Sequence, residues 1–163
     1  MLIRICKIAL VAAVAFFLTL VVFNNLTDYN SNYQFVEHVL SMDTTFPGNA
    51  GMWRALKSPA IDVISYDFII LWESLTALLC WWGVGRCVRH LSADTATFNR
   101  SKNIAVLGLT ASLIQWFVGF ISVGGEWFLM WQSKIWNGQD AAFRMFTTIG
   151  IILIFLLLRE REE

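Results

Sequence analysis

The sequence predicts an all-α membrane protein, with four transmembrane helices in an antiparallel bundle and an ordered periplasmic loop between helices 1 and 2. The first observation is composition: of 163 residues, 57% are hydrophobic and 15% aromatic, more than one soluble core of this size can bury. The second is the distribution of the hydrophobic residues: they form four apolar stretches, each close to the length of roughly 20 residues that a helix needs to cross a bilayer. Helices also satisfy their own backbone hydrogen bonds in lipid. We therefore expect a single four-helix membrane domain.

The first span is expected at residues 5–24, around an apolar run over residues 8–23 that only Thr19 interrupts. Arg4 and Lys7 stand before this run, as basic residues do in a secretory signal. No small-residue cleavage site follows the run, however. We therefore expect a retained membrane anchor and not a removed signal peptide.

The second span is expected at residues 59–86. Ser58 is a good N-cap, Pro59 suits the first helical position, and Asp62 places a negative charge in the opening turn. These signals precede the apolar run 68–84 by about ten residues, at 1.5 Å of rise for each. The second helix is therefore expected to begin outside the hydrocarbon layer.

Residues 25–58 form the predicted outer loop between these spans. Two short helices are expected within it, at residues 34–42 and 50–57, separated by a turn at Pro47–Gly48. Apolar side chains in both segments would let the loop lie on the membrane face. This pattern predicts an ordered lid and not a flexible linker.

The third span is expected at residues 104–125 and the fourth at residues 138–158, joined by an outer loop at 126–137. Asn137 is the expected N-cap of the fourth helix, with Asp140 three residues further on. The chain closes with a charged segment, which we expect to lie in water.

The distribution of Lys and Arg predicts the orientation, because cytoplasmic segments of membrane proteins carry the excess. If both termini are cytoplasmic, the inner set is Arg4, Lys7, Arg86, Arg89, Arg100, Lys102, Arg159 and Arg161, and the outer set is Arg54, Lys57, Lys134 and Arg144. The larger set then lies inside. We therefore expect the N-terminus and the C-terminus in the cytoplasm and both outer loops on the far side.

Three ionisable residues are expected to meet in the outer half of the membrane, and they define the candidate site. Glu73 lies about five residues inside the apolar run 68–84 of the second span, Arg144 enters the fourth span at similar depth, and Glu126 lies at the outer end of the third. Because an intramembrane charge is normally turned inward and paired, we predict that Arg144 pairs with Glu73 or Glu126. The expected hydrogen-bonding neighbours are Gln115, Ser122 and Gln139.

Small and polar residues recur at α-helical spacing on the second and third spans. The third span carries Gly108, Ser112, Gln115, Gly119, Ser122 and Glu126, and the second carries Glu73, Thr76, Cys80 and Gly83. Small residues at this spacing let helices approach closely in a membrane. Helix packing explains the stripes as a whole, and only their ionisable members suggest a binding function.

Other side chains have simpler explanations. Trp127, Trp131 and Trp136 are typical of an aromatic belt at the headgroup level. His38 and His90 lie outside the spans, so the sequence predicts no haem, no other cofactor and no metal site. A net charge of zero gives no reason to expect a nucleic-acid partner. Hydrolase, phosphate-loop and dinucleotide signatures are absent from the sequence, so no enzyme activity is expected.

Several longer runs resemble a known family. These runs are VFNNLTDY (22–29), HVLSMDTTFPGN (38–49), GGEWFLMWQSK (124–134) and WNGQ (136–139). They are similar to a bacterial family of predicted small integral membrane proteins of unknown function. The resemblance implies four helices and a location in the bacterial inner membrane. It brings no catalytic or binding residue with it.

Two functions from different classes remain open. The first, which we favour on the sequence alone, is an accessory or structural subunit that packs with itself or with a larger membrane complex. The second is a transporter or small-ligand-binding protein with a charged site in the outer leaflet half. The lipid bilayer is the expected partner in both cases, together with a membrane protein or a second copy of the chain.

Overall fold

The computed structural model describes residues 1–159, and every regular element within that range is a helix. Four of its helical segments are long and apolar enough to cross a membrane, which confirms the predicted all-α membrane class. The elements are α1 (Leu2–Thr27), α2 (Tyr29–Ser41), the 3₁₀ turn η1 (Ala50–Arg54), α3 (Pro59–Arg89), α4 (Thr95–Ser101), α5 (Asn103–Ile114), the π-helix η2 (Gln115–Trp127), the 3₁₀ turn η3 (Met130–Gln132) and α6 (Gln139–Leu157). Of the charged segment that closes the chain, residues 160–163 lie outside the described range.

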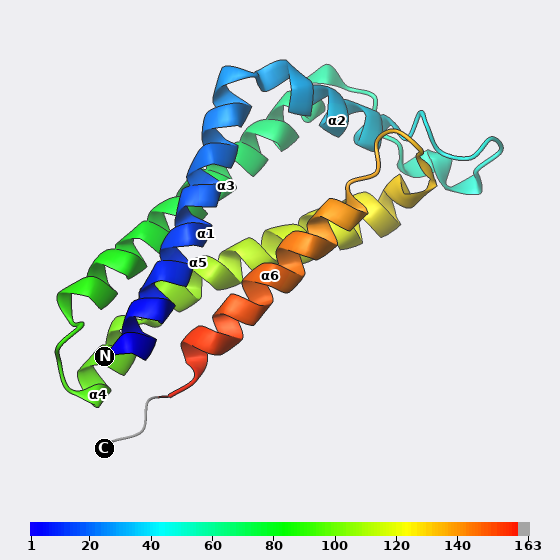
Figure 1. The fold of residues 1–163 in the computed structure, drawn as a ribbon. Coiled ribbons are helices and arrows are strands. Elements are labelled where there is room, and N and C mark those ends of the chain that lie inside the picture. Colours follow the sequence, from blue (N-terminus) through cyan, green and yellow to red (C-terminus); the bar gives the residue numbers. More distant parts are fainter. Residues whose placement is uncertain (160–163) are drawn as a thin grey trace.

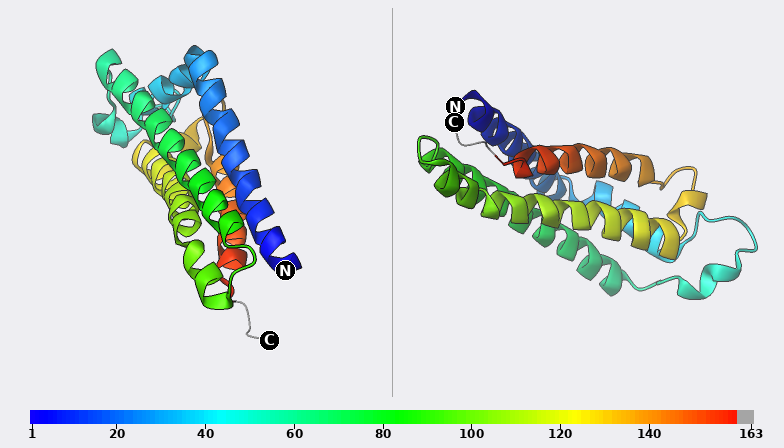
Figure 2. Two further views of the ribbon diagram at one scale, coloured as in Figure 1. Left: turned by 90° about the vertical axis from the view of Figure 1, so that its left-hand side faces the viewer. Right: turned by 90° about the horizontal axis from the view of Figure 1, so that it is seen from below.

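The long helices run between two ends of the molecule (Figures 1 and 2). One end, here called the terminal end, carries the N-terminus, the end of α6, α4 and the link between α3 and α4. There Arg4 of α1 donates to the carbonyl of Leu91 beyond α3 at 2.9 Å, and Lys7 donates to that of Leu158 beyond α6 at 2.5 Å. The opposite end, the lid end, carries α2 and the loop before α6. Successive long segments therefore run in alternating directions.

The segment after α1 is folded, as the sequence led us to expect. Asp28 is the single non-helical residue between α1 and α2, with φ −129° and ψ 61°. From this turn α2 runs across the lid end (Figure 1). Its buried side chains Val36 and Leu40 join Tyr66 and Ile70 of α3 in a small apolar cluster. We call residues 29–58 the lid, because this cluster fixes them over the ends of the long helices.

The internal bounds of the lid differ from the prediction. The expected helix over residues 34–42 begins earlier, at Tyr29, and the expected helix over residues 50–57 is a short 3₁₀ turn that ends at Arg54. The predicted turn at Pro47–Gly48 is present, with Gly48 at φ 76°. Glycine adopts this left-handed conformation without the steric cost that a Cβ brings.

The helix starts follow the capping signals closely. Ser58 is the N-cap of α3 and Pro59 its first residue, although the Ser58 hydroxyl makes no capping hydrogen bond. The N-cap of α6 is Gly138, one residue later than predicted, and the Asn137 side chain accepts from the backbone N–H of Gln139 at 3.1 Å. The predicted capping residue thus still satisfies a free donor at the start of α6.

Helices α3 and α5 approach closely through small residues. A Cβ on Gly83 of α3 would lie 2.5 Å from the backbone of Ala105, and a Cβ on Gly108 of α5 would lie 2.8 Å from the sulfur of Cys80. Neither distance leaves room for a methyl group. The two stripes of small residues are therefore a packing surface at this contact, as the sequence suggested.

The third span is not one α-helix, and this corrects the predicted stripe. After Ile114 the chain continues as a π-helix, in which the Phe128 N–H donates to the carbonyl of Val123, five residues back. A π turn takes in more residues than an α turn, so an α-helical spacing no longer stays on one face. The stripe is buried as far as Gln115, but a Cβ on Gly119 would meet open space.

Two buried lysines cap the C-terminus of α6 at the terminal end. Lys7 and Lys102 are 2% and 4% exposed. Lys7 donates to the carbonyl of Leu158 at 2.5 Å, and Lys102 donates to that of Leu156 at 2.9 Å. The last carbonyls of a helix have no partner within the helix and carry partial negative charge. The two ammonium groups therefore hold α6 against α1 and α5.

Candidate functional site

The site is centred on Glu73, near the middle of the 31-residue helix α3. Its side chain is 2% exposed. It shares the buried face of α3 with Thr76 and Cys80 at helical spacing. The apolar length of α3 thus carries one ionisable residue into the interior of the protein, at a depth where lipid would not tolerate it.

Two amide groups hold the Glu73 carboxyl from two directions. Asn25 of α1 donates from Nδ2 to Oε2 at 2.7 Å, and Gln115 of η2 donates from Nε2 to Oε1 at 2.7 Å. Asn32 of α2 in turn donates from its side-chain amide to the side-chain oxygen Oδ1 of Asn25 at 2.7 Å. Burial of a carboxyl is costly unless its oxygens accept hydrogen bonds, so these amides make the position possible. Four elements of the fold meet in this network.

The structure brings Gln115 to Glu73 as predicted, but it does not bring Arg144 there. Arg144 is exposed on α6, and within residues 1–159 no salt bridge joins it to Glu73 or Glu126. The buried residues of α6 include Ala142, and Arg144 follows two positions later, about 200° around the helix. The arginine therefore faces outward. The predicted ion pair is wrong.

The other three members of the predicted cluster also lie apart from the carboxyl. Glu126 is exposed near the end of η2. The Ser122 hydroxyl donates to the carbonyl of Phe117 in its own helix at 3.0 Å. Gln139 packs its amide against Gly125, where a Cβ would collide with it. The π-helix explains this outcome for Ser122 and Glu126, because it rotates both away from the face that carries Gln115.

A pocket of about 240 Å³ opens beside Glu73, under the lid. Its walls come from α1, α2, α3, η2 and α6, and most of them are apolar or aromatic. The lining residues are Val21, Asn25, Asn32, Phe35, Val36, Tyr66, Ile69, Glu73, Trp116, Phe120, Gly138 and Ala141. Mostly apolar walls with a few convergent polar groups are typical of a small-molecule site.

Three further polar groups in this region are buried without a hydrogen-bond partner among the residues that the structure describes. They are the side-chain carbonyl oxygen of Gln115, the indole N–H of Trp116 and the hydroxyl of Tyr66, and the last two residues line the pocket. A buried donor or acceptor without a partner is costly, and such atoms call for an explanation. A bound molecule with a complementary donor or acceptor would supply one.

Sequence reasoning missed Asn25 and Asn32, which complete the site. A usable signal was present for Asn25: the buried residues of α1 include Lys7, Val11, Val14, Leu18 and Asn25, at steps of four, three, four and seven. This is the spacing of one helix face. Asn32 follows the turn at Asp28, so no periodicity along α1 could have placed it.

The predicted interfacial tryptophans pack against the lid. Trp127 contacts Trp53 at 5.8 Å between ring centroids, and Trp131 contacts Phe46 at 5.7 Å. Trp136 stacks on His38 at 4.6 Å. These pairs join the loop before α6 to the lid, and the Thr44 hydroxyl adds a 2.8 Å hydrogen bond to that of Ser133. The tryptophans therefore close the lid end, in addition to any role at the headgroups.

A tyrosine at the start of the lid contacts α3. The Tyr29 hydroxyl donates to the Asp67 carboxylate at 2.9 Å. Burial, and then the hydrogen bond and negative charge of Asp67, raise the pKa of Tyr29 to about 12. The lid is thus attached to α3 by a group that keeps its proton throughout the physiological range.

For metals, no group of three or more His, Cys, Asp or Glu side chains within residues 1–159 could hold an ion. The three cysteines, Cys6, Cys80 and Cys87, are free thiols.

Comparison with known proteins identifies a family to which the chain belongs. A family described as "Predicted small integral membrane protein (DUF2165)" matches residues 3–159, which is nearly the whole chain. No curated protein and no solved structure matches the sequence.

Proposed function

Since this chain belongs to that family of small integral membrane proteins, we propose that it works within the bilayer, as a binding protein for a small organic cation with an apolar body. The observation that carries this proposal is the state of Glu73: a buried carboxyl beside a pocket, held by two neutral amides and not by a basic residue. An intramembrane carboxyl of this kind points to a functional site.

The chemistry of the pocket supports a cationic ligand. Each oxygen of Glu73 accepts one amide hydrogen bond, and a carboxylate oxygen can accept a second. An ammonium group would neutralise the carboxylate and would donate charge-assisted hydrogen bonds to it, which are stronger than those from neutral donors. Aromatic rings from Phe35, Tyr66 and Trp116 line the same space, and aromatic faces attract cations.

The size of the pocket limits the ligand. A cavity of about 150 Å³ holds benzene, so 240 Å³ has room for an aromatic ring with a short aminoalkyl group. We propose binding without chemical conversion, because the hydrogen-bond partners of Glu73 are amides, which do not act as acids or bases at neutral pH. The lid end is the proposed entrance.

The proposed orientation follows from charge. Arg4, Lys7, Arg86, Arg89, Arg100, Lys102 and Arg159 all belong to segments of the terminal end, and fewer basic residues lie toward the lid end. The excess of Lys and Arg marks the cytoplasmic side. We therefore propose that both termini face the cytoplasm of a bacterium, that the chain lies in the inner membrane, and that the lid faces the periplasm.

The test compares two ligands of the same shape. The purified chain, in nanodiscs of a neutral lipid at pH 7, is titrated calorimetrically with benzylamine, which is then an ammonium ion, and with benzyl alcohol, which is neutral. We expect the amine to bind at least tenfold more tightly than the alcohol. Glu73→Gln should remove that preference, whereas Glu126→Gln, which neutralises an exposed acid near the lid end, should retain it.

Equal binding of amine and alcohol, or no binding of either, would overturn the cationic-ligand proposal. So would a Glu73→Gln variant that binds the amine as the wild type does. Thermal unfolding of each variant, measured in parallel, separates a lost ligand from a lost fold.

An accessory-subunit function is a second candidate, and Arg144 favours it. This arginine is exposed on an apolar helix, and among the described residues no carboxylate pairs with it. A carboxylate on a neighbouring membrane protein, or on a second copy, could pair with it at that depth. Native mass spectrometry of the chain extracted from its own membrane tests this: Arg144→Gln should lose a stoichiometric partner that Lys134→Gln keeps. A wild-type chain that is found alone would exclude this candidate.

A further inference from the structure

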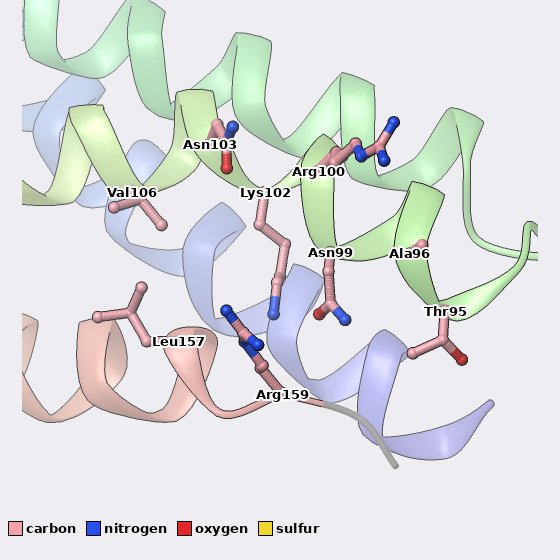
Figure 3. A pocket seen from close by; sticks show the side chains of 9 residues that line it. All are labelled: Thr95, Ala96, Asn99, Arg100, Lys102, Asn103, Val106, Leu157 and Arg159. Carbon is pink, nitrogen blue, oxygen red and sulfur yellow. The ribbon is translucent and has the colours of Figure 1, made fainter. Parts of the chain in front are cut away.

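A second pocket lies at the terminal end, far along the fold from Glu73. It is open, with a volume of about 690 Å³, and it lies between α4, the start of α5 and the end of α6. Its lining residues are Thr95, Ala96, Asn99, Arg100, Lys102, Asn103, Val106, Leu157 and Arg159 (Figure 3). Three of these nine residues are basic and none is acidic. The proposed binding of an organic cation beside Glu73 makes no use of this pocket.

We propose that the terminal-end pocket binds the headgroup of an anionic phospholipid, with Arg159 as the principal contact for its phosphate and Arg100 as a second positive charge at the rim. Arginine presents a planar set of donors that matches phosphate oxygens. Basic pockets between transmembrane helices on the cytoplasmic side are suited to anionic headgroups.

The arrangement of the side chains supports one binding position. Figure 3 shows the nitrogens of Lys102 and Arg159 and the amide of Asn99 turned toward the same space, whereas the guanidinium of Arg100 is turned to the other side of α4, at the rim of the pocket. Lys102 is buried and donates to the carbonyl of Leu156 at 2.9 Å, so it contributes a fixed positive charge behind the pocket. Both arginines are exposed, so an incoming headgroup can reach them.

Asn99 gives an independent indication of a ligand. Its side-chain oxygen Oδ1 is buried, and within the described part of the chain this atom has no hydrogen-bond partner. A phosphate has no proton to offer such an acceptor at neutral pH, but a hydroxylated headgroup such as that of phosphatidylglycerol has two hydroxyl donors. The pocket therefore matches a phosphate together with a hydroxyl donor.

The apolar part of the lining distinguishes a lipid from free phosphate. Val106 of α5 and Leu157 of α6 belong to segments that are apolar enough to cross the membrane, and they line the pocket beside its charged residues. A phospholipid matches this lining, because its charged headgroup is followed by apolar acyl chains. Inorganic phosphate would leave these apolar walls unused.

The experiment measures which lipid the full chain retains. The protein is reconstituted in equal amounts of phosphatidylglycerol and phosphatidylcholine and extracted in mild detergent, and the bound lipids are counted by native mass spectrometry. We expect several-fold enrichment of phosphatidylglycerol. The double variant Arg100→Gln/Arg159→Gln should lose this enrichment. The matched control, Arg86→Gln/Arg89→Gln, removes the same charge from α3 at the same end but outside the pocket, and it should keep the enrichment.

A parallel sample contains excess inorganic phosphate. If the pocket recognises a lipid, phosphate leaves the retained phosphatidylglycerol unchanged, whereas displacement of the lipid would assign the pocket to the free anion. Equal retention of the two lipids by the wild type would overturn the proposal. Equal losses in both double variants would also overturn it, because they would show a general effect of surface charge.

Discussion

The Asn25 side chain donates to Glu73 at 2.7 Å and accepts from Asn32 at 2.7 Å, so one amide connects α3 to the lid. Each amide in this hydrogen-bond network donates to the next polar group. If the lid opens, the bond from Asn32 breaks, and Asn25 then lacks one of its partners. The carboxyl and the lid are therefore coupled through neutral side chains.

The first prediction concerns the second amide of this network. Gln115→Leu should lower the stability of the folded chain by about 1 kcal/mol, because Glu73 loses one of its two donors inside the membrane. Ser122→Ala is the control, since its hydroxyl bonds only to its own helix. Thermal unfolding in detergent measures both variants. Equal stability of Gln115→Leu and wild type would show that the amide does not support the carboxyl.

The contact between α3 and α5 gives a prediction about glycine. Gly83→Ala should destabilise the protein by about 1–3 kcal/mol, because its Cβ would lie 2.5 Å from the backbone of Ala105 and the helices must separate. Gly85→Ala is the matched control two residues away, where a Cβ meets open space. It should be neutral or slightly stabilising. Similar unfolding temperatures for the two variants would contradict the close contact.

The capping of α6 by buried lysines can be tested by removing one ammonium group. Lys7→Met keeps most of the side-chain length but leaves the carbonyl of Leu158 without its 2.5 Å donor. We expect a loss of about 1–2 kcal/mol and faster amide hydrogen exchange in the last turn of α6. The exposed Lys134→Met should change neither quantity. Unchanged exchange in Lys7→Met would mean that α6 ends without help from α1.

Closure of the lid end should depend on Trp136. Trp136→Ala removes the ring that stacks on His38 at 4.6 Å and contacts Phe35 at 6.2 Å. Because the lid then loses aromatic contacts that contribute about 0.5–1.5 kcal/mol each, amide hydrogen exchange in α2 should become faster. Trp82→Ala, on the exposed face of α3, serves as the control. The same protection of α2 in both variants would contradict a closing role for Trp136.

The attachment of the lid by Tyr29 predicts a pH dependence. Burial and Asp67 raise the pKa of Tyr29 from 10.0 to about 12, so its contribution to stability is complete below pH 10 and is lost as the pH rises toward 12. In an absorbance titration of tyrosinate, the difference between wild type and Tyr29→Phe should therefore show that the missing tyrosine ionises near pH 12. If the missing tyrosine instead ionises near pH 10, the contact with Asp67 is not maintained in solution.

The sequence was sufficient for the spans and for the packing face of α3. Runs of apolar residues predict membrane helices, because a helix that crosses the bilayer needs about 20 mostly apolar residues. Cys80 and Gly83 also recur at a spacing that places both on one face of α3. The same argument failed beyond Gln115. There the chain adopts a π-helix, which changes the spacing of every later residue, and nothing in the hydrophobic pattern distinguishes an α turn from a π turn.

The candidate site could be predicted only in part, for a related reason. The sequence indicated Glu73 and Gln115, because lipid makes polar groups costly on any apolar helix. Which partner Glu73 finds depends on how each helix is rotated about its axis, and packing between helices decides that rotation. Arg144 lies at a suitable depth but on the outward face of α6, whereas Asn25 lies on the inward face of α1.

The central claim is that Glu73 is a carboxyl that ligands can reach, and not a closed structural group. Labelling with dicyclohexylcarbodiimide, an apolar reagent that modifies carboxyl groups in apolar surroundings, tests it most directly when mass spectrometry locates the adduct. We predict an adduct on Glu73 that benzyltrimethylammonium, a quaternary cation that the activated carboxyl cannot acylate, suppresses and benzyl alcohol does not. A Glu73 that stays unlabelled, or that is labelled equally with and without the cation, would contradict the account.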